Sequence, residues 1–164
     1  MTTAVTGTVD PRPAHPLLAQ LLTRHGCTEI TAANIDAYVE QPGHAMLVFT
    51  EDPVRVRETL DIAVIVPELI RAFPGRFRVG VLMPESARPL QARYGFRRWP
   101  ALVVLSDGKH VGAIEGLRDW DEFLKELARL LETAPKRPPT ICIPVIASGA
   151  NADGCRSPAT KSIG

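Results

Sequence analysis

The alternation of apolar and polar positions divides the chain into helix-like and strand-like segments. Leucines at helical spacing predict a helix over residues 16–25, which Gly26 ends. The continuous apolar runs AMLVF at 45–49 and ALVVL at 101–105 are typical of strands that are buried on both faces. The chain therefore combines helices with strands from the interior of a sheet.

The other segments complete this order. The predicted elements are a short strand at 28–30, a helix from Thr31 to 40, a helix at 64–73, a strand at 77–82, a helix capped by Ser86 and ending at Tyr94, a strand at 110–115, and a helix at 118–131 with Trp120 among its inward residues. Asp107-Gly108 is a strong signal for a hairpin between the last two strands. The charged residues 50–61 are predicted to form an irregular loop.

This order, preceded by one extra helix, is the topology of thioredoxin. Helical crossovers imply parallel strands, and the final hairpin adds antiparallel ones. We therefore predict an α/β, thioredoxin-like fold, with a central mixed sheet flanked by helices and an extra N-terminal helix. The expected domain covers residues 16–132, between a flexible leader at 1–15 and a proline-rich tail at 133–164.

The Trp99-Pro100 pair falls in the loop where this fold normally has a cis proline. In redox relatives the backbone beside that proline binds an extended peptide, and Trp99 would add a large apolar contact there. The alternative is that Trp99 packs against the region of Pro67 and that Pro100 only maintains the fold.

The redox chemistry of the fold is missing from the sequence. Disulfide exchange needs a reactive thiolate at a helix N-terminus and a second thiol, and the 164 residues contain no Cys-x-x-Cys. After Phe49 the chain reads Thr50-Glu51-Asp52-Pro53, and Val48 takes the place of a buried carboxylate that thioredoxins carry. We therefore expect a protein that is not an enzyme.

Composition excludes several other functions. The 19 basic and 18 acidic residues give a net charge of +1, which does not favour nucleic-acid binding. No export signal or membrane-length apolar run occurs, so we expect a cytoplasmic protein without a membrane partner. The three cysteines, Cys27, Cys142 and Cys155, and the scattered histidines match no common metal site, so no metal and no cofactor are predicted.

Three motifs carry a family resemblance. They are Asp52-Pro53 followed by Arg55, a helix end with Glu68-Leu69 and Phe73-Pro74, and the loop Arg98-Trp99-Pro100-Ala101. With the missing cysteines, this combination resembles the HyaE/HoxO/HupG family of hydrogenase expression proteins over roughly residues 16–131. Met83-Pro84 departs from the pattern, because an acidic residue is expected after the third strand.

The resemblance implies a non-catalytic chaperone for a membrane-bound uptake [NiFe] hydrogenase. The implied partner is the precursor of the small, iron–sulfur subunit, held in the cytoplasm before twin-arginine export, together with other hydrogenase maturation proteins. The residues expected to bind the partner are Arg98, Trp99, Pro100, Glu51, Asp52 and Pro53. In this hypothesis Glu51, Asp52, Glu58 and Asp61 cluster in the loop beside the expected groove and attract the arginines of the signal.

Two other interpretations stay open at this point. The chain could be a degenerate thioredoxin-like oxidoreductase that uses Cys27 or a tail cysteine. It could also be a structural module of an unrelated assembly.

Overall fold

The structure, a computed structural model, describes residues 14–134 of the chain. Its helices are α1 (Pro16–Thr23), α2 (Ile35–Val39), α3 (Glu58–Ala72), α4 (Pro84–Tyr94) and α5 (Trp120–Glu132). Its strands are β1 (Thr28–Glu29), β2 (His44–Phe49), β3 (Arg78–Leu82), β4 (Ala101–Ser106) and β5 (Lys109–Glu115). Helices and strands alternate as far as β4, and the β4–β5 hairpin and α5 then close the domain.

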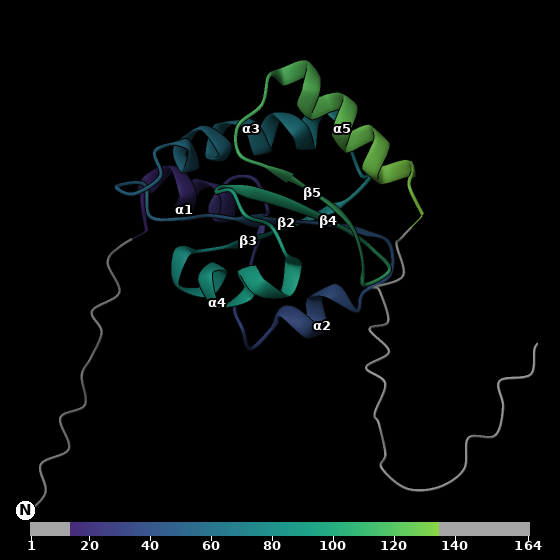
Figure 1. Cartoon of the computed structure of the whole chain (residues 1–164), viewed down its shortest axis with the longest axis horizontal. Helices are drawn as coiled ribbons and strands as arrows, with labels where there is room; N and C mark the ends of the chain where they lie inside the picture. Colours follow the sequence, from purple (N-terminus) through teal and green to yellow (C-terminus); the bar gives the residue numbers. More distant parts are fainter. Residues whose placement is uncertain (1–13, 135–164) are drawn as a thin grey trace, which may run out of the picture.

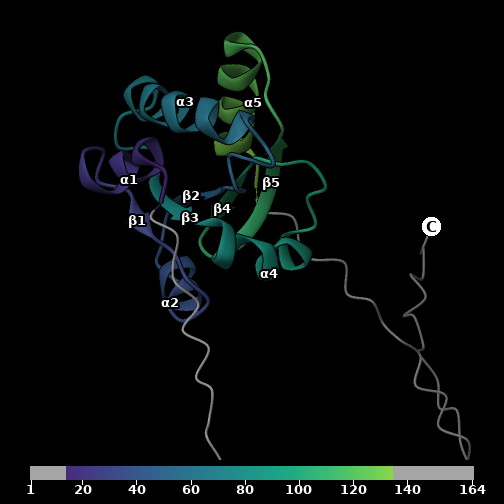
Figure 2. The ribbon, with the colours of Figure 1, turned by 90° about the vertical axis from the view of Figure 1, so that its left-hand side faces the viewer.

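A single mixed sheet holds the five strands in the order β1-β3-β2-β4-β5. The first three run parallel because helices cross over between them, whereas β4 is antiparallel to both β2 and β5. Helices α1, α3 and α5 cover one face of the sheet, and α2 and α4 cover the other, as Figures 1 and 2 show. This arrangement confirms the predicted α/β, thioredoxin-like fold with an extra N-terminal helix.

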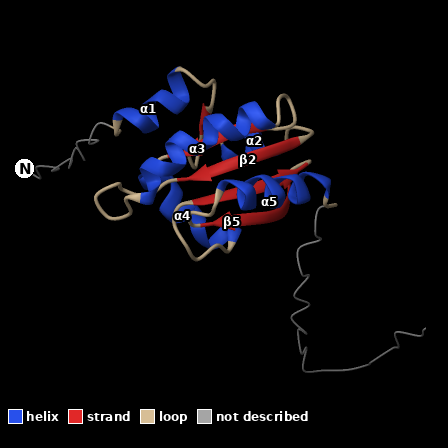
Figure 3. Ribbon diagram, turned by 90° about the horizontal axis from the view of Figure 1, so that it is seen from above, coloured by secondary structure: helices blue, strands red, loops and turns tan. Residues whose placement is uncertain are grey.

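Each face of the sheet has its own apolar core. Met46 and Val48 of β2 belong to the core beneath α1, α3 and α5. The alternate residues Leu47 and Phe49 belong to the core on the α2 and α4 side. Every residue from 45 to 49 is buried, as the apolar run predicts for an interior strand. Figure 3 views the first face from above, with α5 over the β4–β5 hairpin.

The hairpin is confirmed, and its turn has the predicted chemistry. Asp107 and Gly108 have φ angles of 48° and 76°, so both turn residues are left-handed. Asparagine, aspartate and glycine tolerate this conformation, which matches the twist of the flanking strands. The turn also contacts Gly43, the residue just before β2, because Asp107 Oδ1 accepts a hydrogen bond of 2.7 Å from the Gly43 N–H.

The predicted loop at 50–61 is wrong from residue 58 onward, since α3 begins at Glu58 and not at residue 64. The predicted start was too late because proline favours the first turn of a helix, whereas Pro67 lies in the interior of α3. The correction moves Glu58 and Asp61 out of the loop and onto the first turns of a helix.

Three further expectations are corrected. Helix α2 begins at Ile35, after an N-cap at Asn34, so Thr31 does not cap it. Helix α4 begins at Pro84 with Met83 as its N-cap, so Ser86 is already helical. Trp120 does not face the core, because 41% of its surface is exposed at the start of α5. The predicted leader at 1–15 and tail at 133–164 lie almost entirely outside the described residues.

Candidate functional site

Several strands begin or end at one edge of the sheet. Phe49 at the end of β2 pairs with Ala101 at the start of β4, and Ala101 pairs with Glu115 at the end of β5. Two segments therefore leave the sheet from neighbouring strands. They are residues 50–57, here called the acidic loop, and residues 95–100, here called the tryptophan loop. All six residues predicted to bind a partner lie on these two loops.

The tryptophan loop has a cis peptide bond between Trp99 and Pro100, as the fold predicts. Pro100 is buried, whereas Trp99 is half-buried. The Trp99 ring lies edge-on to Phe96, with 5.0 Å between ring centroids, and belongs to the core on the α2 and α4 side. Packing against Pro67 is thus excluded, because Pro67 belongs to α3 on the opposite face.

Glu115 fixes the backbone of the tryptophan loop. Its Oε2 atom accepts hydrogen bonds from the N–H groups of Arg97 and Arg98, at 2.9 and 3.0 Å. The Gly116 N–H also donates to the Pro100 carbonyl, at 2.8 Å. The side chains of Arg97 and Arg98 are exposed and form no ion pair within residues 14–134. The main chain of the loop is therefore fixed by β5 and the residue after it, while its two arginine side chains are exposed to solvent.

Glu51 has a different environment from the one expected for a partner-binding residue. Its side chain is only 8% exposed and forms an ion pair with Arg88 of α4. Both carboxylate oxygens accept a hydrogen bond from Arg88 Nε, at 3.0 and 2.9 Å. This hydrogen bond lowers the pKa of the Glu51 carboxyl, against the opposing effect of burial. The pair joins the acidic loop to α4, and no sequence motif identified Arg88 as its partner.

Asp52 and Pro53 form the turn that follows. The Asp52 carboxylate accepts a hydrogen bond of 2.9 Å from the Val54 N–H, and its carbonyl accepts one of 2.8 Å from Arg55. Asp52 and Pro53 are half-buried, while 87% of Val54 is exposed. The turn thus presents an apolar side chain next to a partly accessible carboxylate.

Two exposed apolar residues follow β5 along the chain, one before α5 and one at its start. Leu117 is 40% exposed and Trp120 is 41% exposed. The hydrogen bond between Gly116 and Pro100 brings the two backbones together, and the next residues outward along them are Leu117 and Trp99. Sequence reasoning missed Leu117, and it assigned Trp120 to the core.

The described part of the chain has no cysteine at this edge. Cys27 is buried and precedes β1, so it lies toward the other end of the parallel strands. Burial raises the pKa of the Cys27 thiol to about 11, which keeps it protonated near neutral pH. Cys142 and Cys155 lie outside the described residues.

The described residues offer neither a metal site nor a membrane-spanning helix. Within residues 14–134, no group of three or more histidine, cysteine, aspartate or glutamate side chains could hold a metal ion. In the same part of the chain, every helix is too short or too polar to cross a membrane.

Comparison with known proteins gives consistent matches. The model of the family described as Hydrogenase-1 expression protein HyaE matches residues 17–123. Hydrogenase expression/formation protein HoxO of Cupriavidus necator is 40% identical over 145 residues, which cover 87% of this chain and 89% of that protein. HupG of Bradyrhizobium diazoefficiens is 32% identical over 129 residues, which cover 76% of this chain and 87% of that protein.

A solved structure is also similar. It is the crystal structure of a hydrogenase expression/formation protein HupG from Rhodopseudomonas palustris CGA009, with 34% sequence identity and a TM-score of 0.46. The similarity covers 63% of this chain and 94% of that one.

The fold and the sheet edge together define a thioredoxin-like domain in which Glu51 and Asp52 stand where a redox thiol is expected. The matches extend over most of this domain and over most of the relatives. The chain belongs to the HyaE family of hydrogenase expression proteins. Membership confirms the resemblance and supports a role in hydrogenase maturation.

Proposed function

We propose that the protein is a non-catalytic chaperone of the cytoplasm. In this proposal it binds the precursor of the small, iron–sulfur subunit of a membrane-bound uptake [NiFe] hydrogenase before twin-arginine export. Family membership supports the maturation role, and the names of the relatives suggest an accessory protein. The observation that carries the proposal is an exposed apolar edge where redox relatives have their nucleophile.

The apolar part of this edge suits a hydrophobic client segment. Trp99 of the tryptophan loop is half-buried, Leu117 and Trp120 of the segment after β5 are exposed, and Glu115 holds the backbone of the loop in place. Tryptophan is enriched among the residues that dominate binding energy, and an ordered loop loses little entropy when it binds. A twin-arginine signal has such an apolar stretch behind its basic head.

The acidic part of the edge is smaller than the sequence suggests. Glu51 is already paired with Arg88, so it is not a free carboxylate for a basic client. Asp52 remains partly accessible, and Glu58 and Asp61 are exposed on α3. We therefore assign the attraction of the signal's arginines to these three residues, with the apolar surface as the main contact.

Affinity capture tests the proposal directly. The tagged protein is incubated with the small-subunit precursor, with the same subunit lacking its signal, and with the large subunit. We expect the precursor to be retained, and the double variant Leu117→Ser/Trp120→Ser to retain about tenfold less, because it removes apolar contact area.

Val64→Ser is the matched control, because Val64 is 58% exposed on α3 and lies outside the two loops. This variant should retain the precursor normally. Capture of the large subunit alone, or of no hydrogenase subunit, would overturn the proposed partner.

A further inference from the structure

A basic pocket lies at the opposite end of the sheet from the two loops. It has a volume of about 370 Å³ and lies between the start of β2 and the segment leading into β3. Its lining includes His44, Arg76, Phe77 and Arg78, and no acidic residue of the described chain lines it. The two arginine side chains give the hollow a positive character, and His44 adds a hydrogen-bonding group.

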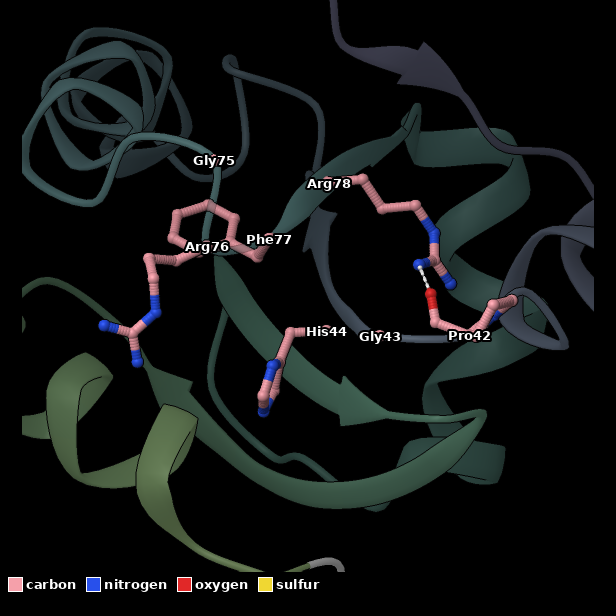
Figure 4. Close-up of a pocket in the computed structure, with 7 residues that line it drawn as sticks. All are labelled: Pro42, Gly43, His44, Gly75, Arg76, Phe77 and Arg78. Atoms are coloured by element: carbon pink, nitrogen blue, oxygen red, sulfur yellow. Dashed lines mark hydrogen bonds between the residues drawn. The ribbon is translucent and has the colours of Figure 1, made fainter.

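Two of these basic groups are available to a ligand. In Figure 4 the side chains of Arg76 and His44 extend to the same side of the pocket, one from each of the two segments. Arg76 is exposed and His44 is half-buried. Within residues 14–134, neither side chain forms an ion pair or a side-chain hydrogen bond. Both can therefore donate to an incoming oxyanion.

The third basic group, Arg78, is held in place by the protein itself. The Arg78 guanidinium turns away from His44 toward the end of α2 (Figure 4), where it donates to the carbonyls of Pro42, Gln41 and Tyr38 at 2.8, 2.7 and 3.1 Å. It also lies over the Tyr38 ring, 5.2 Å from the centroid. Arg78 thus keeps its charge next to the pocket without a carboxylate partner in the described chain.

The remaining surfaces are also held in place. The N–H of the lining residue Gly43 donates a hydrogen bond of 2.7 Å to the Asp107 carboxylate, which fixes the backbone of the pocket to the β4–β5 turn. Phe77 is half-buried and packs against Phe73, with 6.4 Å between ring centroids. Phe77 therefore gives the pocket an apolar patch beside its cations.

We propose that this pocket binds a small oxyanion, a phosphate monoester or a carboxylate, attached to a flat apolar group. Arg76 and His44 hold the oxyanion, the flat group lies against Phe77, and Arg78 adds long-range attraction from the wall. The site is independent of the client surface, because it lies at the other end of the strands.

NMR of the full-length, ¹⁵N-labelled protein tests the proposal with three probes: phenyl phosphate, benzoate and inorganic phosphate. Phenyl phosphate or benzoate should shift the amide signals of Gly43, Gly75 and Phe77 in a saturable way, and the stronger of the two identifies the preferred oxyanion. Inorganic phosphate should bind more weakly, because it lacks the apolar group. Arg76→Gln should weaken binding of the stronger probe about tenfold.

Arg97→Gln is the matched control, since Arg97 is also exposed and forms no ion pair within residues 14–134 but lies at the other end of the sheet. It should leave binding unchanged. The proposal is overturned if neither organic probe gives saturable shifts at these amides, or if Arg97→Gln weakens binding as much as Arg76→Gln. Equal affinity for inorganic phosphate would overturn the role of Phe77.

Discussion

The acidic loop and the tryptophan loop leave the sheet from adjacent strands but use their charged residues in opposite ways. Glu51 turns inward and is bound by Arg88, whereas Arg97 and Arg98 turn outward while Glu115 holds their backbone. A charged residue next to a functional edge is thus available to a partner only when no neighbouring element already binds it. In this molecule, the acidic loop mainly stabilises the edge of the sheet, and the tryptophan loop mainly supplies the side chains that a partner can contact.

The largest effect is expected from the tryptophan loop. Trp99→Ala should weaken capture of the small-subunit precursor about thirtyfold, because truncating a tryptophan at the centre of an interface typically removes about 2 kcal/mol. It should also lower the free energy of unfolding by about 2 kcal/mol, since Trp99 is half-buried against Phe96. Binding is measured by titration at a temperature where urea unfolding shows the variant to be folded.

Trp99→Phe is the control for this change, because it keeps an aromatic ring beside Phe96. It should recover most of the stability and part of the binding. Normal precursor binding by Trp99→Ala would show that the tryptophan loop does not present the client surface.

A smaller effect on stability, and none on binding, is expected at Glu51. Glu51→Gln removes the charged acceptor of Arg88 and should lower the free energy of unfolding by about 1 kcal/mol. Arg88 remains partly solvated, which limits the loss. Urea unfolding at neutral pH measures the change. A clear loss of precursor capture by this folded variant would contradict the supporting role of the acidic loop.

The pH dependence of the same pair gives a sharper test. The pKa of Glu51 is lower in the folded protein than its ordinary value of 4.5, so its stabilisation is fully present above pH 4.5. It is lost as the pH falls through the folded-state pKa. The difference in stability between wild type and Glu51→Gln should therefore shrink in acid. The exposed pair of Glu126 with Arg129 supplies the control variant Glu126→Gln, which should change stability little.

The smallest effect is expected at Asp52. Asp52→Asn removes a partly accessible charge but keeps an oxygen that can accept the Val54 N–H. Precursor binding should weaken about threefold at low salt, and the difference should fade at high salt, because exposed charges are screened. A loss of precursor binding greater than that of Trp99→Ala would show that the acidic loop, and not the tryptophan loop, is the main contact with the precursor.

Most of the fold could be predicted because local signals and global topology agree. The runs at 45–49 and 101–105 became interior strands, and Asp107-Gly108 became the hairpin turn. The errors fell at helix starts, where tertiary contacts outweigh local preference. Pro67 suggested a late start for α3, yet the buried side chains of Thr59 and Ile62 favour an earlier one.

The candidate site was predicted less completely than the fold. The sequence located the cis bond at Trp99-Pro100, because the position follows from the topology. It could not show that Arg88 binds Glu51, since the two residues are 37 positions apart and no local pattern links them. Glu115 was missed for the same reason, because its contact with Arg98 depends on the register of β5 against β4.

Arg78 has a consequence for the folding of the short helix α2. Five residues are too few for a helix that is stable in water by itself. Arg78 of β3 binds three carbonyls at the end of α2 and in the turn after it, so an interior strand of the sheet supplies the donors that the helix end lacks. Helix α2 and the sheet therefore form one cooperative unit, and amides of α2 should exchange with solvent only in openings that also release β3.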